Sequence, residues 1–472
     1  MRVLFAASEA YPFVKTGGLA DVVFALPRAL RAHVDVTVVL PLYRWIDREG
    51  FGIVEQAGEA FDAVLGTQTH HVRLYETRYG GVRFLFVESP LLCERDYPYG
   101  PPGGAYADNA ERFGLFSHAV ARLAAGFDLV HLNDWQTALA ALLLRQSGRT
   151  VRCVFTIHNL AYQGLFDASL LSTLGIDPSY FTMEGIEFYG QLSFMKAGIG
   201  CADAVTTVSP TYAEEILTPE YGCGLEGYLN RHRAKLSGIL NGIDTAFFSP
   251  ADDPALARTY DTVEGKAANK AAMLARFELA ADDTRPLFVF IGRFTWQKGL
   301  DILVEALPEM LRSSCIVAVL GEGDPAYRLR LETLAERYEN LYPIFGYDEA
   351  LSHRLYAAAD FLLMPSMFEP CGLNQMIAMR YGTLPLVRRT GGLADTVAPF
   401  EAFDADAATG YGICFEPPKS AALSDAFERA LGLYAQKQRL EDIASHDMRC
   451  DFSWTKSAKQ YARLYNACQR SK

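Results

Sequence analysis

The sequence predicts an α/β protein of two doubly wound domains, each built on a parallel sheet covered by helices on both faces. Short, nearly continuous apolar runs alternate with longer segments of helical periodicity, which is typical of buried parallel strands. In the first half the predicted strands are 3–7, 34–40, 82–87, 129–132, 151–157 and 204–208. The same alternation restarts in the second half at 287–291, 315–320, 342–345, 361–364, 384–387 and 413–415.

The boundary between the two series is predicted where turn residues cluster, at about 241–250. It is followed by an Ala/Asp-rich segment and a predicted helix over about 267–279. We therefore assign residues 1–245 to the first domain and 246–453 to the second. The final segment, 454–472, is predicted to form a separate helix, because its apolar residues recur at helical spacing, namely Trp454, Ala458, Tyr461, Leu464, Tyr465 and Cys468.

A repeated hexapeptide, T-G-G-L-A-D, occurs once in each domain and follows a cation each time, Lys15 and Arg389. The first copy opens an amphipathic helix, and Pro399 should keep the helix after the second copy short. A Gly-Gly turn at a helix N-terminus presents unpaired backbone N–H groups, which suit a phosphate. One copy could equally be an ordinary strand-to-helix turn, whereas two copies favour one anionic ligand held by both domains.

The composition excludes several functional classes. The 472 residues are 50% hydrophobic and carry a net charge of −12, which argues against nucleic acid or an anionic membrane as a bulk partner. Nine cysteines without a C-x-x-C pair predict reduced thiols in a cytoplasmic protein. We expect neither a signal peptide nor a transmembrane helix, because no apolar run is long enough.

Two further patterns are expected to be incidental. G-E-G-D-P-A at 321–326 fits a loose dinucleotide pattern but lies in the second strand unit of its domain, which disfavours a dehydrogenase. D-A-D at 404–406 resembles the metal-binding D-x-D of another transferase class but lies in an Ala/Asp-rich loop. No His, Cys and carboxylate set has the usual spacing of a zinc site, so no metal is expected.

Seven motifs spread over residues 15–395 resemble those of the bacterial glycogen synthases and plant starch synthases, and the resemblance covers 3–465. They are K-T-G-G-L-A-D-V (15–22), N-D-W-Q (133–136), T-I-H-N-L-A-Y-Q-G (156–164), N-G-I-D (241–244), G-R-F-T-W-Q-K-G-L-D (292–301), P-S-M-F-E-P-C-G-L (365–373) and R-T-G-G-L-A-D (389–395). The resemblance implies the GT-B architecture: two Rossmann-like domains face a central cleft, and the last helix returns to the first domain.

The same resemblance implies the activity. It predicts transfer of glucose from ADP-glucose to the non-reducing end of an α-1,4-glucan such as glycogen, with retention of configuration and no cofactor. Arg293 and Lys298, after the strand 287–291, would bind the diphosphate and stabilise the charge on the leaving oxygen. Glu369 is the carboxylate most closely tied to catalysis, while Asp134 and His158 surround the glucosyl group.

The resemblance also implies a donor-binding set, in which Tyr347 stacks on adenine. The set is Lys15, Gly17, Gly18, Asn241, Arg293, Lys298, Tyr347, Cys371, Gly372, Leu373, Thr390 and Gly391. Related transferases often carry a ribose-binding Glu eight residues after Glu369, but this chain has Ile377 there. The absence of an obvious nucleophile and base favours a front-face reaction, in which the leaving phosphate helps to deprotonate the acceptor.

The residues leave several alternatives open. A UDP-glucose-using synthase, another GT-B glucosyltransferase, an epimerase or a phosphorylase would share the fold. A catalytically inactive glucan-binding scaffold would keep the fold but lose the phosphate cations. The joint presence of Lys15, Arg293, Lys298 and Glu369 disfavours that scaffold.

Overall fold

The computed structural model describes residues 1–101 and 103–470, which divide into two compact units. The first unit is Met1–Asn241 together with Trp454–Lys472, and the second is Gly242–Ser453. The division falls four residues before the predicted boundary, within the N-G-I-D motif.

The first unit contains a mixed sheet of ten strands in the order β13-β12-β8-β7-β1-β2-β6-β5-β3, with β4 paired to β5. Its strands are β1 (Arg2–Ala6), β2 (Asp35–Pro41), β3 (Val54–Glu55), β4 (Phe61–Leu65), β5 (Gln68–Tyr79), β6 (Val82–Glu88), β7 (Leu129–Asn133), β8 (Arg152–Ile157), β12 (Ala204–Thr207) and β13 (Leu236–Gly238). The strands from β13 to β6 are parallel, and all six predicted strands lie among them.

The expectation of a purely parallel sheet is wrong at one edge of this unit. Strands β3, β4 and β5 pair in antiparallel fashion and extend the sheet beyond β6. The β5–β6 hairpin turns at Gly80 and Gly81, both at positive φ (55° and 79°), as a tight two-residue hairpin requires. The alternation of β5 is interrupted by exposed His and Arg residues, so periodicity alone did not reveal this strand.

Helices cover this sheet and give it a buried core. They are α1 (Gly18–Leu30), α2 (Pro90–Cys93), α3 (Asn109–Leu123), α4 (Trp135–Gln146), α5 (Phe194–Cys201), α6 (Pro210–Glu215), α7 (Glu226–Arg231) and α16 (Thr455–Arg470), with short 3₁₀ turns η1 (Ala124–Gly126), η2 (Ala168–Leu171), η3 (Pro178–Tyr180) and η4 (Arg233–Lys235). A small separate sheet is formed by β9 (Leu165–Asp167), β10 (Glu187–Phe188) and β11 (Gln191–Ser193).

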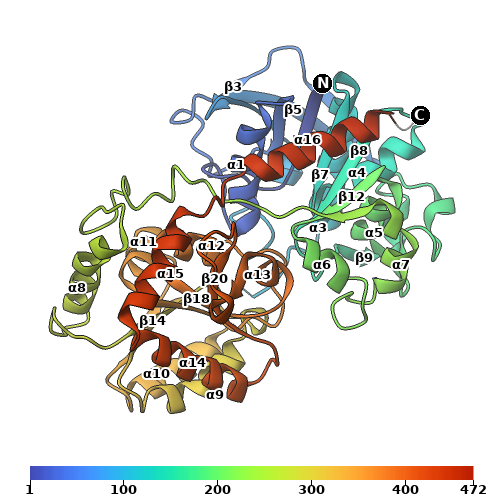
Figure 1. Ribbon diagram of the computed structural model, residues 1–472. Helices are drawn as coiled ribbons and strands as arrows, with labels where there is room; N and C mark the ends of the chain where they lie inside the picture. Colours follow the sequence, from blue (N-terminus) through green and yellow to red (C-terminus); the bar gives the residue numbers. More distant parts are fainter. Residues whose placement is uncertain (102, 471–472) are drawn as a thin grey trace. The chain divides into compact units, whose positions relative to one another are not determined.

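The C-terminal helix α16 packs on the first unit, where Figure 1 shows it crossing the strands. Its apolar face buries Tyr461 and Tyr465 against the sheet. The Tyr465 hydroxyl lies 2.7 Å from Nδ1 of His131, a buried residue of β7, and this bond joins residues 334 positions apart in the sequence. A fully buried aromatic residue with its polar group satisfied anchors a helix firmly.

The second unit has a sheet of seven parallel strands in the order β16-β15-β14-β17-β18-β20-β19. The strands are β14 (Leu287–Ile291), β15 (Ile316–Gly321), β16 (Leu341–Phe345), β17 (Phe361–Met364), β18 (Leu384–Arg388), β19 (Val397–Pro399) and β20 (Gly410–Phe415). The helices are α8 (Lys266–Arg276), α9 (Leu300–Met310), α10 (Pro325–Ala335), α11 (Glu349–Ala358), α12 (Asn374–Arg380), α13 (Gly391–Thr396), α14 (Ser420–Tyr434) and α15 (Lys437–Arg449), with 3₁₀ turns η5 (Val263–Gly265), η6 (Trp296–Lys298) and η7 (Phe400–Ala402).

Both sheets share the central strand order. Counting parallel strands along the chain, the first sheet runs 3-2-1-4-5-6-7 and the second runs 3-2-1-4-5-7-6, so both contain the 3-2-1-4-5 arrangement of the doubly wound Rossmann fold. Helix α13 is short and gives way to β19, as Pro399 predicted. Within the described residues, no helix combines the length and apolarity needed to cross a membrane.

Candidate active site

The strand order creates a switch point in the first unit, between β1 and β7. Chain connections leave these neighbouring strands toward opposite sides, so a crevice forms at their carboxyl ends, where ligands of such sheets bind. The segment after β1 carries Lys15, and β7 is followed directly by Asp134. The next strand, β8, is followed by His158. The structure thus brings Asp134 and His158 to one edge of the sheet.

Glu9, a residue that the sequence analysis did not select, organises the K-T-G-G loop. Its buried carboxylate accepts hydrogen bonds from the backbone N–H of Thr16 (2.6 Å), the Thr16 hydroxyl (2.9 Å) and the Tyr99 hydroxyl (3.0 Å). It also accepts the N–H of Gly17, and burial nevertheless raises its pKa. In this structure an internal carboxylate therefore binds the amides of Thr16 and Gly17, whereas phosphate binding by the Gly-Gly turn stays a prediction.

The neighbouring residues of this loop have other roles. The Lys15 ammonium forms a half-buried ion pair with Asp21, with its Nζ 2.9 Å from a carboxylate oxygen. Gly17 is extended, with φ −164°, and a Cβ added there would meet no atom within 4 Å. Backbone geometry alone does not require glycine at this position. Gly18, which is exposed, begins α1.

Asp134 is held in a strained conformation. Its φ of 55° and ψ of 179° fall in a region that is almost restricted to glycine and costs about 1–3 kcal/mol for other residues. Its carboxylate accepts the N–H of His158 at 2.7 Å, and its own N–H donates to Thr156 O at 3.0 Å. Burial raises its pKa to about 7. Such strain and such a shift in pKa concentrate at functional sites.

The imidazole of His158 is fixed in one tautomer. Asn133 donates from Nδ2 to Ala6 O at 3.0 Å, so its Oδ1 faces His158 Nε2 at 2.9 Å. Since a carboxamide oxygen can only accept, His158 Nε2 carries the proton and Nδ1 keeps a lone pair. Burial lowers the pKa of His158 to about 3, so the ring is neutral at physiological pH. A neutral His158 can accept from a hydroxyl but cannot serve as a cation.

The raised pKa of Asp134 predicts a pH-dependent stability. The folded state favours the protonated form of Asp134, and this preference adds to the free energy of unfolding. The added stability is fully present below pH 3.8 and is lost as the pH rises through about 7. Asp134→Asn keeps an oxygen acceptor and tolerates positive φ. Measured by urea unfolding, the free energy of unfolding of the variant should increase relative to that of wild type by roughly 1–4 kcal/mol as the pH is raised from 5 to 8. A difference that stays constant with pH would contradict this prediction.

The second unit has its own switch point, between β14 and β17. The loops after these strands are joined, since the N–H of Met367 donates to Gln297 O at 2.9 Å. Gly299, at φ 71°, lies so close to Pro365 that an added Cβ would be 1.9 Å from its carbonyl oxygen. Only glycine satisfies both conditions. This contact brings Lys298 next to Glu369.

Lys298 and Glu369 form the central polar pair of this unit. The Lys298 ammonium lies 2.6 Å from Glu369 Oε2, and the Ser366 hydroxyl donates to the same oxygen at 3.0 Å. The Glu369 side chain is 6% exposed and that of Lys298 is 22% exposed. Arg388, buried at the end of β18, supports this loop by donating from Nε to Ser366 O at 2.7 Å and from Nη2 to Met367 O.

The other predicted site residues of this unit differ in their exposure to solvent. Arg293 is exposed at the carboxyl end of β14, and Tyr347, at 73% exposed, has its hydroxyl 3.2 Å from Glu349. Thr390 and Gly391 are buried, and an added Cβ at Gly391 would lie 2.0 Å from Glu369 O. The second T-G-G loop is therefore packed on the Glu369 loop.

Three consecutive predicted residues follow Pro370, in the turn that leads into α12. Cys371 is buried, whereas Gly372 and Leu373 are half-buried. Gly372 has φ 70°, a turn conformation that suits glycine. Asn241, the last residue of the first unit's main segment, is buried, and its Oδ1 has no hydrogen-bond partner among the described residues.

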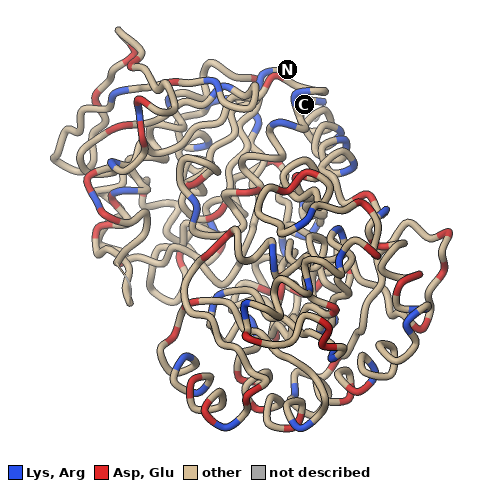
Figure 2. Tube along the Cα trace, turned by 90° about the vertical axis from the view of Figure 1, so that its left-hand side faces the viewer, with Lys and Arg blue, Asp and Glu red and all other residues tan. Residues whose placement is uncertain are grey.

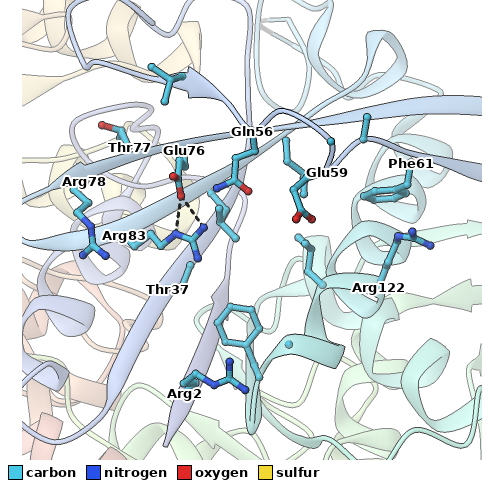
Figure 3. Close-up of a pocket in the computed structure, with 18 of the residues that line it drawn as sticks. Arg2, Thr37, Gln56, Glu59, Phe61, Glu76, Thr77, Arg78, Arg83 and Arg122 are labelled. Atoms are coloured by element: carbon cyan, nitrogen blue, oxygen red, sulfur yellow. Dashed lines mark hydrogen bonds and ion pairs between the residues drawn. The ribbon is translucent and has the colours of Figure 1, made fainter.

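A pocket of about 930 Å³ lies at the opposite edge of the first sheet and contains none of the predicted site residues. Figure 3 shows Arg2, at the start of β1, together with Gln56, Glu59 and the ion pair of Arg83 with Glu76. These residues surround the amino ends of the strands. Because ligands of doubly wound sheets bind at the carboxyl ends, this pocket is not the donor site.

Comparison with known proteins defines the class to which this protein belongs. A model described as the starch synthase catalytic domain matches residues 2–231, and one described as glycosyl transferases group 1 matches 274–447. The protein is therefore a glycosyltransferase with the two-domain GT-B fold.

Its relatives define the family. Glycogen synthase from Novosphingobium aromaticivorans is 43% identical, with 99% of this chain and 98% of the relative covered. Glycogen synthase 1 from Methylococcus capsulatus is 44% identical, with 98% and 96% covered. The catalytic domain of starch synthase IV from Arabidopsis thaliana, bound to ADP and acarbose, is 33% identical, with 99% of each chain covered and a TM-score of 0.91. The chain belongs to the glycogen synthase and starch synthase family.

Proposed function

We propose that this protein transfers glucose from ADP-glucose to the non-reducing end of an α-1,4-glucan, with retention of configuration. The observation that carries this proposal is the placement of Lys298 and Glu369 at the switch point of the second sheet. Family membership supplies the class of donor, a nucleotide sugar, and of acceptor, a glucan. The preference for ADP is supported by the related starch synthase, which was described with ADP bound.

The chemistry follows from the charges present. Cleavage of the bond between glucose C1 and the diphosphate leaves negative charge on the departing oxygen, which fixed cations stabilise. We assign this role to Arg293 and Lys298, with Lys15 contributed by the first unit. Glu369 would accept hydrogen bonds from glucose hydroxyls. We assign the donor ribose, phosphates and adenine to the remaining donor-binding residues, among them Tyr347 for adenine.

The acceptor side is assigned to the first unit. His158 is neutral and keeps a lone pair on Nδ1, so it can accept a hydrogen bond from a sugar hydroxyl. Asp134 sets the position of His158 through its bond to the backbone N–H. We propose that the leaving phosphate deprotonates the acceptor hydroxyl, since Glu369 already accepts hydrogen bonds from Lys298 and Ser366.

An incorporation assay tests the proposal. The purified protein is incubated with radiolabelled ADP-glucose or UDP-glucose and with glycogen, and label in precipitated polymer is counted. We expect label from ADP-glucose, with a kcat/KM at least about 10-fold above that for UDP-glucose, a difference of about 1.4 kcal/mol. Higher incorporation from UDP-glucose would support the alternative donor. No incorporation from either would refute the synthase and favour the inactive scaffold.

We propose that catalysis requires no metal ion, because the diphosphate charge is assigned to Arg and Lys side chains. In the D-A-D segment, Asp404 Oδ1 accepts the N–H of Asp406 at 3.0 Å and so caps a turn. Initial rates should remain unchanged in the presence of EDTA. A loss of activity that Mg²⁺ or Mn²⁺ restores would assign a catalytic ion to this segment.

We further propose a cytoplasmic protein that acts on small nucleotide sugars and glucan rather than on nucleic acid or membranes. All nine cysteines are free thiols, which suits a reducing compartment. Figure 2 shows Lys and Arg interspersed with Asp and Glu along the chain, and the net charge is −12. Cell fractionation would test the cytoplasmic location, and a pull-down with labelled glucan would test whether the protein binds glucan.

A further inference from the structure

Three buried side chains at the end of α15 form a cluster that the proposed mechanism does not use. Donor atoms of His446, Asp447 and Cys450 all lie within 4.8 Å of one another. The three residues are 5%, 0% and 9% exposed. The rings of Phe403 and Tyr411 border His446, with centroids 5.5 Å away in each case. The cluster therefore lies in a buried part of the second unit that is bordered by two aromatic rings.

A backbone carbonyl completes the set of donors. The oxygen of Thr409, just before β20, lies 2.9 Å from His446 Nε2 and 3.5 Å from Cys450 Sγ. The same Nε2 and Sγ are 3.5 Å apart. Tetrahedral zinc, with bonds of about 2.0–2.3 Å to N, O and S, holds its ligands about 3.3–3.8 Å from one another. In this structure the separations are hydrogen-bond distances, and the His446 ring N–H and the Cys450 thiol both donate to the Thr409 carbonyl. A zinc ion would replace those protons. Two of the three separations already fall in its range, and the third is 0.4 Å below it.

The carboxylate of Asp447 provides an independent indication of a cation. Its Oδ1 accepts the N–H of Tyr411 at 2.9 Å, whereas its Oδ2 is buried and has no hydrogen-bond partner. Among the described residues, no cationic side chain forms an ion pair with it. An unpaired buried carboxylate oxygen is costly, and a bound divalent cation would remove that cost.

We propose that His446, Asp447, Cys450 and the Thr409 carbonyl bind one Zn²⁺ ion that stabilises the second unit. Imidazole and thiolate ligands favour zinc over Mg²⁺ or Ca²⁺, which prefer oxygen ligands. The ion would join α15 to β20 immediately before residues 451–453, where the chain leaves this unit. The H-D-x-x-C pattern escapes a search for zinc spacings because the helix and a backbone carbonyl supply the geometry.

This proposal is independent of the proposed function, since none of its ligands lies at a switch point. The test uses the full chain, stripped with a chelator, dialysed and titrated with ZnCl₂. Mass spectrometry of the bound metal should show one equivalent, and the melting temperature should rise by several degrees on zinc addition. Co²⁺ should give thiolate charge-transfer absorption in the near ultraviolet and the visible bands of a tetrahedral site.

Matched variants identify the ligands. Cys450→Ser and His446→Gln should lose stoichiometric zinc and the zinc-dependent rise in melting temperature. Cys414→Ser, which removes another buried thiol of the same unit, should retain both, and a Cys223→Ser background removes the exposed thiol. Because a variant could fail to fold, the cobalt spectrum of the Cys223→Ser protein is decisive by itself. Substoichiometric zinc, or cobalt binding without thiolate absorption, would overturn the proposal.

Discussion

Replacing Lys298 by alanine is expected to lower kcat for glucosyl transfer by about 10²-fold or more, because one preorganised cation for the leaving diphosphate is lost. The same substitution should also destabilise the second unit. Lys298 is the ion-pair partner of Glu369, whose side chain is only 6% exposed, and its removal leaves Ser366 as the remaining side-chain donor to that carboxylate. We expect a loss of roughly 1–3 kcal/mol in the free energy of unfolding, measured in urea.

Arg293→Ala is the matched control for this experiment. Arg293 is exposed, so its replacement should reduce kcat to a similar extent while leaving the free energy of unfolding within about 0.5 kcal/mol of wild type. Each variant is compared with wild type in the incorporation assay and in urea. Full activity in either variant would remove its side chain from the proposed charge stabilisation. Equal destabilisation by both would contradict the structural role assigned to Lys298.

The strand-end residues show how far the sequence could define the site. Parallel strands are nearly continuous apolar runs, so their ends were clear at Ile291 and at Met364, and every predicted strand is present. Polar residues just beyond such ends face one edge of the sheet, so the sequence predicted Arg293 and Lys298 beyond the end of one strand and Glu369 beyond the end of another. The contact between Lys298 and Glu369 required the loop packing of Gly299 on Pro365, which no local pattern specifies.

Glu9 shows where sequence patterns fail. The Gly-Gly turn predicted free amides, but whether an amide is free depends on every polar group nearby. Glu9 lies seven residues before Thr16 and its other partner, Tyr99, is 90 positions away, so this network arises from tertiary structure. The signal that was available is a carboxylate within an otherwise apolar segment after β1. An acidic residue there must find donors, and the nearest unpaired donors are the amides of the next turn.

Replacement of Glu369 by glutamine is expected to have the largest effect on catalysis and little effect on nucleotide binding. The amide keeps the size of the side chain and an oxygen that can accept from Ser366, so the loop should keep its structure. It lacks the negative charge that we assign to the glucosyl end of the donor. We expect kcat to fall by about 10³-fold, the upper part of the range for one preorganised group.

The affinity for ADP decides whether this assignment is correct. In the wild type Lys298 is held 2.6 Å from the Glu369 carboxylate, so a diphosphate must compete with that carboxylate for the same ammonium. Glutamine removes the competing charge, so the Kd for ADP, measured by calorimetry, should stay equal or decrease. Glu332→Gln, on the exposed face of α10, is the control and should change neither kcat nor Kd. A rise in the Kd for ADP as large as the loss of kcat would place Glu369 at the phosphates instead of the sugar.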